Sequence, residues 1–218
     1  MKPPSGRERK DRVKNKKIKD SSKQWLQRHI NDPYVHKANA EGFRSRAAFK
    51  LIEINEKIHI LKPGMKVVDL GAAPGGWSQV LAKKKMAHIA AIDILAMDPI
   101  EGVDFIEMDF TDNEAPDRLK SIMQGEADVV LSDLSPNTTG HKRTDHLRMM
   151  ALVEMAWDFA KDVLKPGGSF VTKVFQGGAE GDFLAGLKPH FQTVKHIKPP
   201  ASRSESSEIY LIGIGFRK

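Results

Sequence analysis

Four apolar runs of this chain each end in an aspartate, a side chain that needs a partner or a ligand wherever it is buried. The four are Asp69, Asp93, Asp109 and Asp133. Because open α/β sheets bind ligands beyond the carboxyl ends of their strands, we expect these carboxylates to lie along one edge. One such ending is common, but four are difficult to explain by packing alone. The pattern predicts a binding site with acidic walls.

A glycine-rich turn follows the first of these acids, in the segment 67–79 with the sequence VVDLGAAPGGWSQ. An apolar run, a turn of small residues and a helix start form the nucleotide-binding corner of a doubly wound sheet. A dinucleotide would require the pattern G-x-G-x-x-G, which Ala73 and Pro74 break. An acid before a Pro-Gly-Gly tip instead favours a cofactor without phosphate and with a cationic end, such as S-adenosylmethionine. The cofactor-binding residues expected here are Asp69, Gly71, Gly75, Gly76 and Trp77.

Asp93 lies 22 residues after Gly71, close to the offset of about 20 residues at which a carboxylate reaches the ribose hydroxyls of a bound nucleotide. We therefore predict that Asp93 binds the ribose, and we expect Asp109 at the adenine amino group. For the glycine turn alone, the alternative is a tight connection between packed elements. The position of Asp93 argues against that alternative.

A lysine interrupts the apolar run 169–175, where Lys173 stands between Val171 and Phe175. Lysine is rarely buried unless it is paired, and side-chain alternation should point it toward one face near the binding edge. We expect a functional pair with Asp133, on the neighbouring strand. The alternative is a lysine whose charged end reaches the solvent.

The order of the predicted elements indicates the fold class. Strands are expected near 67–70, 88–93, 103–110, 127–133, 169–175, 191–197 and 208–216. Helices separate the strands except the last two, which should be antiparallel neighbours because a loop joins them. Before the first strand we expect a linker over 24–40 and a helix capped by Ser45. The pattern predicts an α/β, Rossmann-like fold with a seven-stranded, mostly parallel sheet, an antiparallel last strand and helices on both faces.

Composition limits the possible functions. The chain has 218 residues, of which 40% are hydrophobic, enough for one domain with a buried core. The absence of cysteine excludes disulfides, thiolate metal sites and the cysteine adduct common in pyrimidine C5 methylation. No apolar run approaches the ~18 residues of a membrane span, and the eight histidines show no metal-ligand spacing. We expect a cytoplasmic protein without a metal or a membrane partner.

The net charge of +7 comes from residues 1–23, which hold ten Lys and Arg against three acids. We expect a basic tail over 1–23, disordered in the free protein, followed by a single domain over 24–218. Such a tail favours attraction to phosphate, as in a basic arm on nucleic acid. The alternative is a tail that only aids solubility.

Seven motifs agree in order and spacing with one known family. They are 34–38 (YVHKA), 44–51 (RSRAAFKL), 69–79 (DLGAAPGGWSQ), 97–100 (MDPI), 132–137 (SDLSPN), 174–177 (VFQG) and 207–210 (SEIY). Over residues 22–218 the chain resembles the FtsJ/RrmJ family of ribose 2′-O-methyltransferases, and within it the bacterial members that methylate a uridine of large-subunit (23S) ribosomal RNA. The resemblance implies an S-adenosylmethionine-dependent methyltransferase fold and a monomeric enzyme that acts on ribosomal RNA in the assembled large subunit.

The resemblance also implies site residues. It assigns a Lys-Asp-Lys-Glu tetrad to Lys37, Asp133, Lys173 and Glu208. Because a ribose 2′-hydroxyl must lose its proton to react, we expect Lys173 to accept the proton, Asp133 to orient Lys173, Lys37 to help position the hydroxyl and Glu208 to support them. It assigns cofactor binding to Gly75, Trp77, Asp93, Asp109 and Asp133. The loop after Asp133 departs from the commonest family sequence at residues 134–135 and 138–141. The contacts of this loop with the substrate therefore stay open, whereas the expected reaction is unaffected.

Other classes remain open at this point. An amino-group methyltransferase would carry an Asn/Asp-Pro-Pro-aromatic motif after the fourth strand, whereas this chain has DLSP at 133–136. A small-molecule O-methyltransferase fits the cofactor corner but neither the basic tail nor the tetrad. A 2′-O-methyltransferase of tRNA or of an mRNA cap shares the chemistry. A ribosome-assembly factor that binds RNA without catalysis is supported only by the charge.

Overall fold

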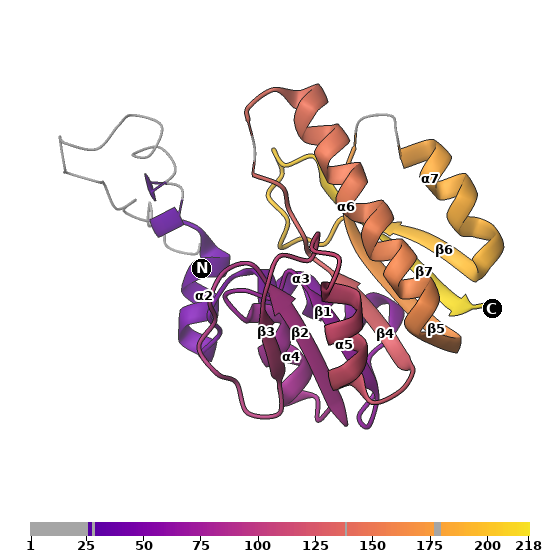
Figure 1. Cartoon of the computed structure of the whole chain (residues 1–218). Helices are drawn as coiled ribbons and strands as arrows, with labels where there is room; N and C mark the ends of the chain where they lie inside the picture. The colour runs from indigo at the N-terminus through magenta and orange to yellow at the C-terminus, as the bar shows by residue number, and fades with distance from the viewer. Residues whose placement is uncertain (1–25, 28, 138, 177–179) are drawn as a thin grey trace, which may run out of the picture.

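The computed structural model describes residues 26–27, 29–137, 139–176 and 180–218 (Figure 1). The basic tail predicted over residues 1–23 lies outside this part of the chain. The helices are α2 (Pro33–Glu41), α3 (Ala47–Ile58), α4 (Gly76–Lys83), α5 (Ala115–Met123), α6 (Lys142–Val163), α7 (Glu180–Leu187) and the 3-10 turn η1 (Lys188–His190). The strands are β1 (Lys66–Leu70), β2 (His88–Asp93), β3 (Asp104–Glu107), β4 (Ala127–Ser132), β5 (Leu164–Phe175), β6 (Phe191–Ile197) and β7 (Glu208–Phe216).

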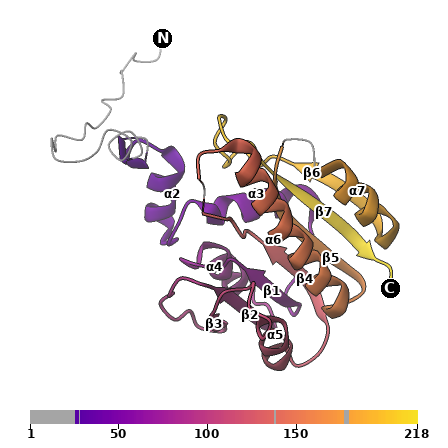
Figure 2. The same cartoon turned by 45° about the horizontal axis from the view of Figure 1, so that its top comes forward.

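The seven strands form one sheet in the order β3-β2-β1-β4-β5-β7-β6. The pairs from β3 to β5 are parallel, and β7 runs antiparallel to both of its neighbours. The predicted fold class is therefore confirmed, including the antiparallel last strand. Helices α2 and α7 lie at opposite sides of the molecule (Figure 2). The strand order changes direction at β1 and β4, where ligands of such sheets bind.

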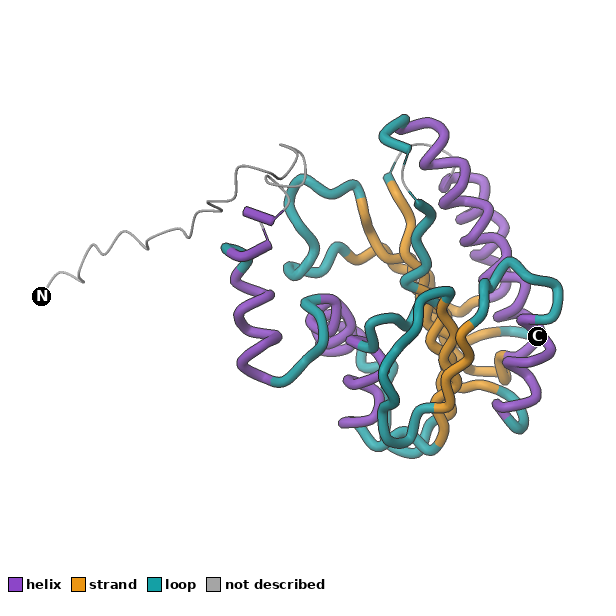
Figure 3. Tube along the Cα trace, turned by 60° about the vertical axis from the view of Figure 1, so that its left-hand side comes forward, coloured by secondary structure: helices purple, strands orange, loops and turns teal. Residues whose placement is uncertain are grey.

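The sheet separates two hydrophobic cores, because neighbouring residues of a strand point to opposite faces. Val67 packs with α3 and α4 on one face, and Val68 packs with α5 and α6 on the other. Val129 and Val130 of β4 divide in the same way. Figure 3 shows the strands between two groups of helices. Trp157 of α6 belongs to the second of these cores.

Helix α2 corrects the interpretation of residues 24–40 as a linker. Its N-cap is Asp32, whose carboxylate accepts a backbone hydrogen bond of the first turn at 3.0 Å, and Pro33 takes the first position. Gly42, with φ 73°, ends the helix. Within the helix only Ala38 is buried. The helix lacks an apolar stripe, so hydrophobic periodicity could not reveal it.

Helix α3 corrects the predicted cap. The N-cap position is Arg46, which makes no capping hydrogen bond with its side chain, and not Ser45. Ser45 Oγ is buried without a hydrogen-bond partner among the described residues. A Cβ atom at Gly76 would collide with this hydroxyl. Ser45 therefore packs against the start of α4, where only glycine leaves room for it.

Within the residues that the structure describes, no helix combines the length and the apolar composition of a membrane span. The same residues hold no group of three or more His, Asp or Glu side chains arranged as a metal site.

Candidate active site

The turn after β1 brings the ends of β1, β2 and β4 together. Gly71 N donates to the last-but-one carbonyl of β2 at 2.9 Å, and Asp133 N donates to the last carbonyl of β1 at 2.9 Å. Gly71 has a φ of 81°, and a Cβ atom there would lie 2.8 Å from Leu134 N. Two backbone segments can therefore meet at this point only around a glycine.

Asp93 ends β2 and faces the glycine turn. Its Oδ2 accepts from Ala73 N at 2.9 Å, and its Oδ1 accepts from Leu95 N at 2.8 Å. Each carboxylate oxygen can accept a second hydrogen bond, so the fixed carboxylate can still receive two hydroxyl groups. The following residues, Ile94 and Leu95, are 62% and 65% exposed. Asp93 thus combines a pair of acceptors with an adjacent apolar surface, as a nucleoside requires.

Asp69 is completely buried at the end of β1. Its Oδ2 accepts from Ser78 Oγ at 2.7 Å, and Oδ1 has no hydrogen-bond partner among the described residues. Burial raises the pKa of Asp69 to about 7, although the Ser78 hydrogen bond opposes the shift and the charges of Asp133 and Asp93 add to it. The three carboxylates therefore repel one another, which favours a cationic ligand over a phosphate at this edge.

The start of α4 lies beside the turn. Gly75 has a φ of 107° and is the N-cap, and Gly76 is the first helical residue. The side chain of Trp77 is 3% exposed, and its indole Nε1 donates to Ala47 O at 2.8 Å. The indole therefore packs between α3 and the sheet. The backbone N–H of Trp77, in the first turn of α4, is the polar group of this residue that can donate to a ligand.

Asp109 lies two residues beyond β3, which ends at Glu107 and is shorter than predicted. Its Oδ1 accepts from the backbone N and the hydroxyl of Thr111, both at 2.8 Å. Asp109 therefore shapes a turn after the strand. The second carboxylate oxygen is the acceptor that it has for an amino group.

Lys173 and Asp133 form the pair expected from the sequence. Lys173 Nζ lies 3.2 Å from Asp133 Oδ1 and donates to Asp133 O at 2.8 Å. Tyr210 OH donates to the same Oδ1 at 2.7 Å. Burial alone would raise the pKa of Asp133, but Lys173, Lys50 and the Tyr210 hydroxyl outweigh it and lower the pKa. Burial and the charge of Asp133 raise the pKa of Tyr210, so its hydroxyl remains a donor.

A second lysine and acid pair lies beside the first. Lys50 Nζ is 2.7 Å from Glu208 Oε1, and both side chains are 13% exposed. In the sheet, Lys173 is the direct partner of Tyr210 across β5 and β7. Glu208 is two residues before Tyr210, so all three side chains lie on one face. The Lys50 ammonium lies 5.9 Å from the centre of the Tyr210 ring.

The structure does not bring Lys37 to this group. Its side chain is 56% exposed on α2, with Nζ 4.0 Å from Glu41 and 4.4 Å from the centre of the Phe49 ring. Lys50 of α3, and not Lys37, lies beside Glu208, so a role for Lys37 in the site stays a prediction. Lys50 lies inside the 44–51 motif, on a helix with many buried residues, and a cation there needs an acidic partner. That signal could have identified it.

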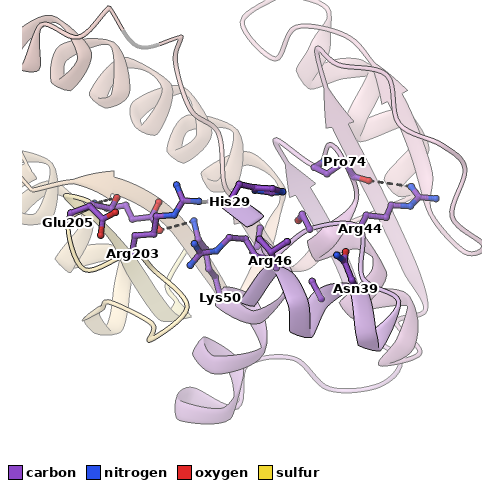
Figure 4. A pocket seen from close by; sticks show the side chains of 14 residues that line it. His29, Asn39, Arg44, Arg46, Lys50, Pro74, Arg203 and Glu205 are labelled. Atoms are coloured by element: carbon purple, nitrogen blue, oxygen red, sulfur yellow. Dashed lines mark hydrogen bonds and ion pairs between the residues drawn. The ribbon is translucent and has the colours of Figure 1, made fainter. Parts of the chain in front are cut away.

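A pocket of about 620 Å³ opens beside the second pair. It lies between α2, the start of α3 and the connection from β6 to β7 (Figure 4), and its wall includes Lys50, Glu208, Arg203 and Pro74. Figure 4 shows Arg44 turned away from Arg203, toward Pro74. The pocket therefore extends from Pro74, in the glycine turn after β1, to the Lys50–Glu208 pair.

Comparison with known proteins gives one consistent result. A profile of the family described as "FtsJ-like methyltransferase" matches residues 43–216. The chain is 59% identical to "Ribosomal RNA large subunit methyltransferase E" of Azorhizobium caulinodans, over 98% of this chain and 92% of that protein. It is 56% identical to the protein of the same name of Mesorhizobium japonicum, over 95% and 81%.

The fold agrees with a solved relative. A crystal structure of a ribosomal RNA methyltransferase from Plasmodium falciparum superposes with a TM-score of 0.72 and 33% sequence identity. The match covers 80% of this chain and 98% of that one.

Proposed function

The chain belongs to the FtsJ-like methyltransferase family, and from this premise we propose that it methylates the ribose 2′-hydroxyl of a uridine in large-subunit (23S) ribosomal RNA, on the assembled subunit. The methyl donor is S-adenosylmethionine. The observation that carries the proposal is the Lys173–Asp133 contact at the acidic edge, beside the Lys50–Glu208 pair that lines the pocket. The names of the relatives support ribosomal RNA as the substrate.

The acidic edge is the proposed cofactor site. Asp93 would bind the ribose hydroxyls, and Asp109 the adenine amino group. Asp69 and Asp133 would face the cationic end, since mutual repulsion of the carboxylates favours a positive charge there. The backbone of the turn would complete the site through the remaining predicted residues Gly71, Gly75, Gly76 and Trp77. When bound, S-adenosylmethionine supplies a methyl group that is already activated by its sulfonium.

The proton of the acceptor hydroxyl is the remaining problem, because a ribose 2′-hydroxyl is a poor nucleophile until that proton is removed. We assign its removal to Lys173 Nζ, which must carry a free lone pair at that step. Asp133 fixes this nitrogen through its carboxylate and its backbone carbonyl. Tyr210 in turn fixes the carboxylate. The chain thereby aligns the proton acceptor before the substrate binds.

Lys50 and Glu208 are the proposed acceptor-positioning pair, in the role that the sequence assigned to Lys37. Their position in the wall of the pocket supports contact with the target nucleotide. The pair is nearly buried, and each charge is compensated by the other. A paired lysine can hold the hydroxyl oxygen without leaving a charge unmatched.

The alternatives lose support for specific reasons. A non-catalytic assembly factor does not need a buried lysine paired with an aspartate at a cofactor edge. A methyltransferase of tRNA or of an mRNA cap would share these residues, but the relatives with 56–59% identity are named for large-subunit ribosomal RNA. We further propose a monomer that works in the cytoplasm, where large ribosomal subunits mature.

Incubation with labelled S-adenosylmethionine tests the function. The substrates are large ribosomal subunits from a strain that lacks this enzyme, the same RNA without ribosomal proteins, tRNA and capped mRNA. We expect one labelled uridine, methylated at O2′, in the assembled subunit. Label on a base, or label on tRNA or capped mRNA but not on the subunit, would refute the proposal.

A further inference from the structure

One face of α3 carries three charged residues that all reach toward the connection from β6 to β7. They are Arg46 at the N-cap, Lys50 and Glu53, with the spacing i, i+4, i+7 of one helix face. Lys50 binds Glu208 and belongs to the site described above. The other two contact the loop at a single residue, Ala201.

Ala201 is held through its backbone. Its N–H donates to Glu53 Oε2 at 2.6 Å, and its carbonyl accepts from Arg46 Nη2. Ala201 is completely buried, so both polar groups need partners within the protein. Both partners are side chains of α3, a segment far away in the sequence. The loop is therefore fastened to the helix at this point.

Glu53 and Arg46 are themselves held in place by α2 or by its N-cap residue. Glu53 Oε1 accepts from Tyr34 OH at 2.7 Å. Arg46 Nη1 donates to Asp32, the N-cap of α2. Burial raises the pKa of Tyr34 to about 12, and the hydrogen bond to Glu53 adds to the shift. Since each oxygen of Glu53 has a different partner, the carboxylate cannot rotate without breaking a contact.

The loop is also braced between Ala201 and Glu208. Ser206 N donates to Arg203 O at 3.1 Å, and Glu208 N donates to Ser206 Oγ at 3.2 Å. Lys198 Nζ donates to Ser206 O at 2.7 Å and to a second loop carbonyl at 3.2 Å. A displacement at Ala201 is therefore transmitted to Glu208.

We propose that Glu53 and Arg46 are positioning residues, which set the place of Glu208 beside Lys50 by gripping both backbone polar groups of Ala201. This inference rests on the proposed function, because its effect on turnover passes through the Lys50–Glu208 pair. Neither residue needs to touch the RNA or the cofactor. Loss of the grip lets Glu208 move relative to Lys50, and a displacement of about 1 Å at a reacting site can cost about 100-fold in rate.

Three variants of α3 separate positioning from general stability. Glu53→Ala removes both contacts, whereas Glu53→Gln keeps an acceptor for Ala201 N and a donor for the Tyr34 oxygen. Glu56→Ala is the matched control, because Glu56 lies exposed on the same helix with the same charge. Arg46→Lys provides a second test, since one ammonium cannot span Asp32 and Ala201 O as a guanidinium does.

The first measurement needs no substrate. Hydrogen–deuterium exchange of a peptide covering 198–207 should be at least about tenfold faster at Ala201 in Glu53→Ala and in Arg46→Lys. It should match the wild type in Glu56→Ala and stay within about threefold in Glu53→Gln. Equal exchange at Ala201 in all variants would refute the proposal that Glu53 and Arg46 hold the Ala201 backbone, whether or not the protein methylates RNA.

The second measurement is the single-turnover rate of methyl transfer to large subunits. Glu53→Ala should lower it by about 10- to 100-fold with cofactor affinity unchanged, and Glu53→Gln should recover most of it. In a Glu208→Gln background, Glu53→Ala should add less than about twofold, because both changes act through one pair. A further 10- to 100-fold loss of the single-turnover rate in that background would mean that Glu53 does not act through the Lys50–Glu208 pair. An inactive wild type with fast exchange in Glu53→Ala would refute only the proposed function.

Discussion

The cofactor side and the acceptor side of the site are built in different ways. The proposed cofactor side consists of Asp69, Asp93 and the turn 71–77, and its main contacts join a strand end to the turn beside it. The acceptor side consists of Lys50 and Lys173 with Glu208 and Tyr210, which come from a helix and two strands far apart in the sequence. The first is set by local backbone geometry. The second also needs α3 to pack against β7, which brings Lys50 to Glu208.

The largest effect is expected where the two sides meet. Lys173→Ala removes the proposed proton acceptor and should lower the single-turnover rate at least about 10³-fold, within the range of general base catalysis. Cofactor affinity, measured by calorimetry, should change by less than about threefold. Lys161→Ala, at a half-buried lysine of α6 that pairs with Asp158, is the control. A comparable loss of cofactor affinity would erase the distinction between the sides.

A comparison of two lysines tests the acceptor side alone. Lys50→Ala leaves Glu208 unpaired and should lower the transfer rate by about 100-fold. Lys37→Ala removes an exposed side chain of α2 and should leave the rate within about twofold. The rates are measured with saturating cofactor. If Lys37→Ala is the more damaging change, the assignment made from the sequence was correct and the grouping with Lys50 is not functional.

The cofactor side should respond in affinity. Asp93→Ala removes acceptors for two ribose hydroxyls, each charge-assisted bond contributing about 1.5–3 kcal/mol, so the dissociation constant should rise at least about tenfold. Asp109→Ala should raise it less, because one amino group is involved. Calorimetry with both variants and a thermal melt of each checks affinity and folding. An unchanged dissociation constant for Asp93→Ala would remove this residue from the site.

The last expected effect concerns stability and its pH dependence, not the transfer rate or the cofactor affinity. The pKa of Asp69 is about 7 in the folded protein and near 3.8 in an ordinary aspartate, so the folded state binds this proton more tightly. Its contribution to stability is complete below about pH 4 and is lost as the pH rises to about 7, by up to about 4 kcal/mol. Asp69→Asn should flatten this slope. Denaturant unfolding between pH 4 and 7 measures it, and parallel curves for both proteins would contradict the assignment.

This contrast also explains what the sequence could predict. Strand ends with acids and a glycine turn are local patterns, so the sheet, the cofactor corner and the pairing of Lys173 with Asp133 followed from them. Helix α2 was not predicted, because its ends are marked by an N-cap and a C-terminal glycine but it has no apolar stripe. Lys37 was assigned from the family resemblance and Lys50 was not considered. The place of Lys50 in the 44–51 motif and on a largely buried helix hinted at a paired lysine, but its contact with Glu208 depends on which helix faces β7. That is a tertiary fact, and the hydrogen bond of Tyr210 to Asp133 is another.

The identity of the proton acceptor is the central claim of this account. Its most direct test is the single-turnover rate of Lys173→Arg on large ribosomal subunits, with cofactor saturating. Arginine preserves the positive charge beside Asp133 but does not give up its proton near neutral pH. We expect cofactor binding to survive and transfer to be lost, as in Lys173→Ala. Retention of most of the wild-type rate would show that Lys173 acts through charge and alignment, and that the proton leaves by another route.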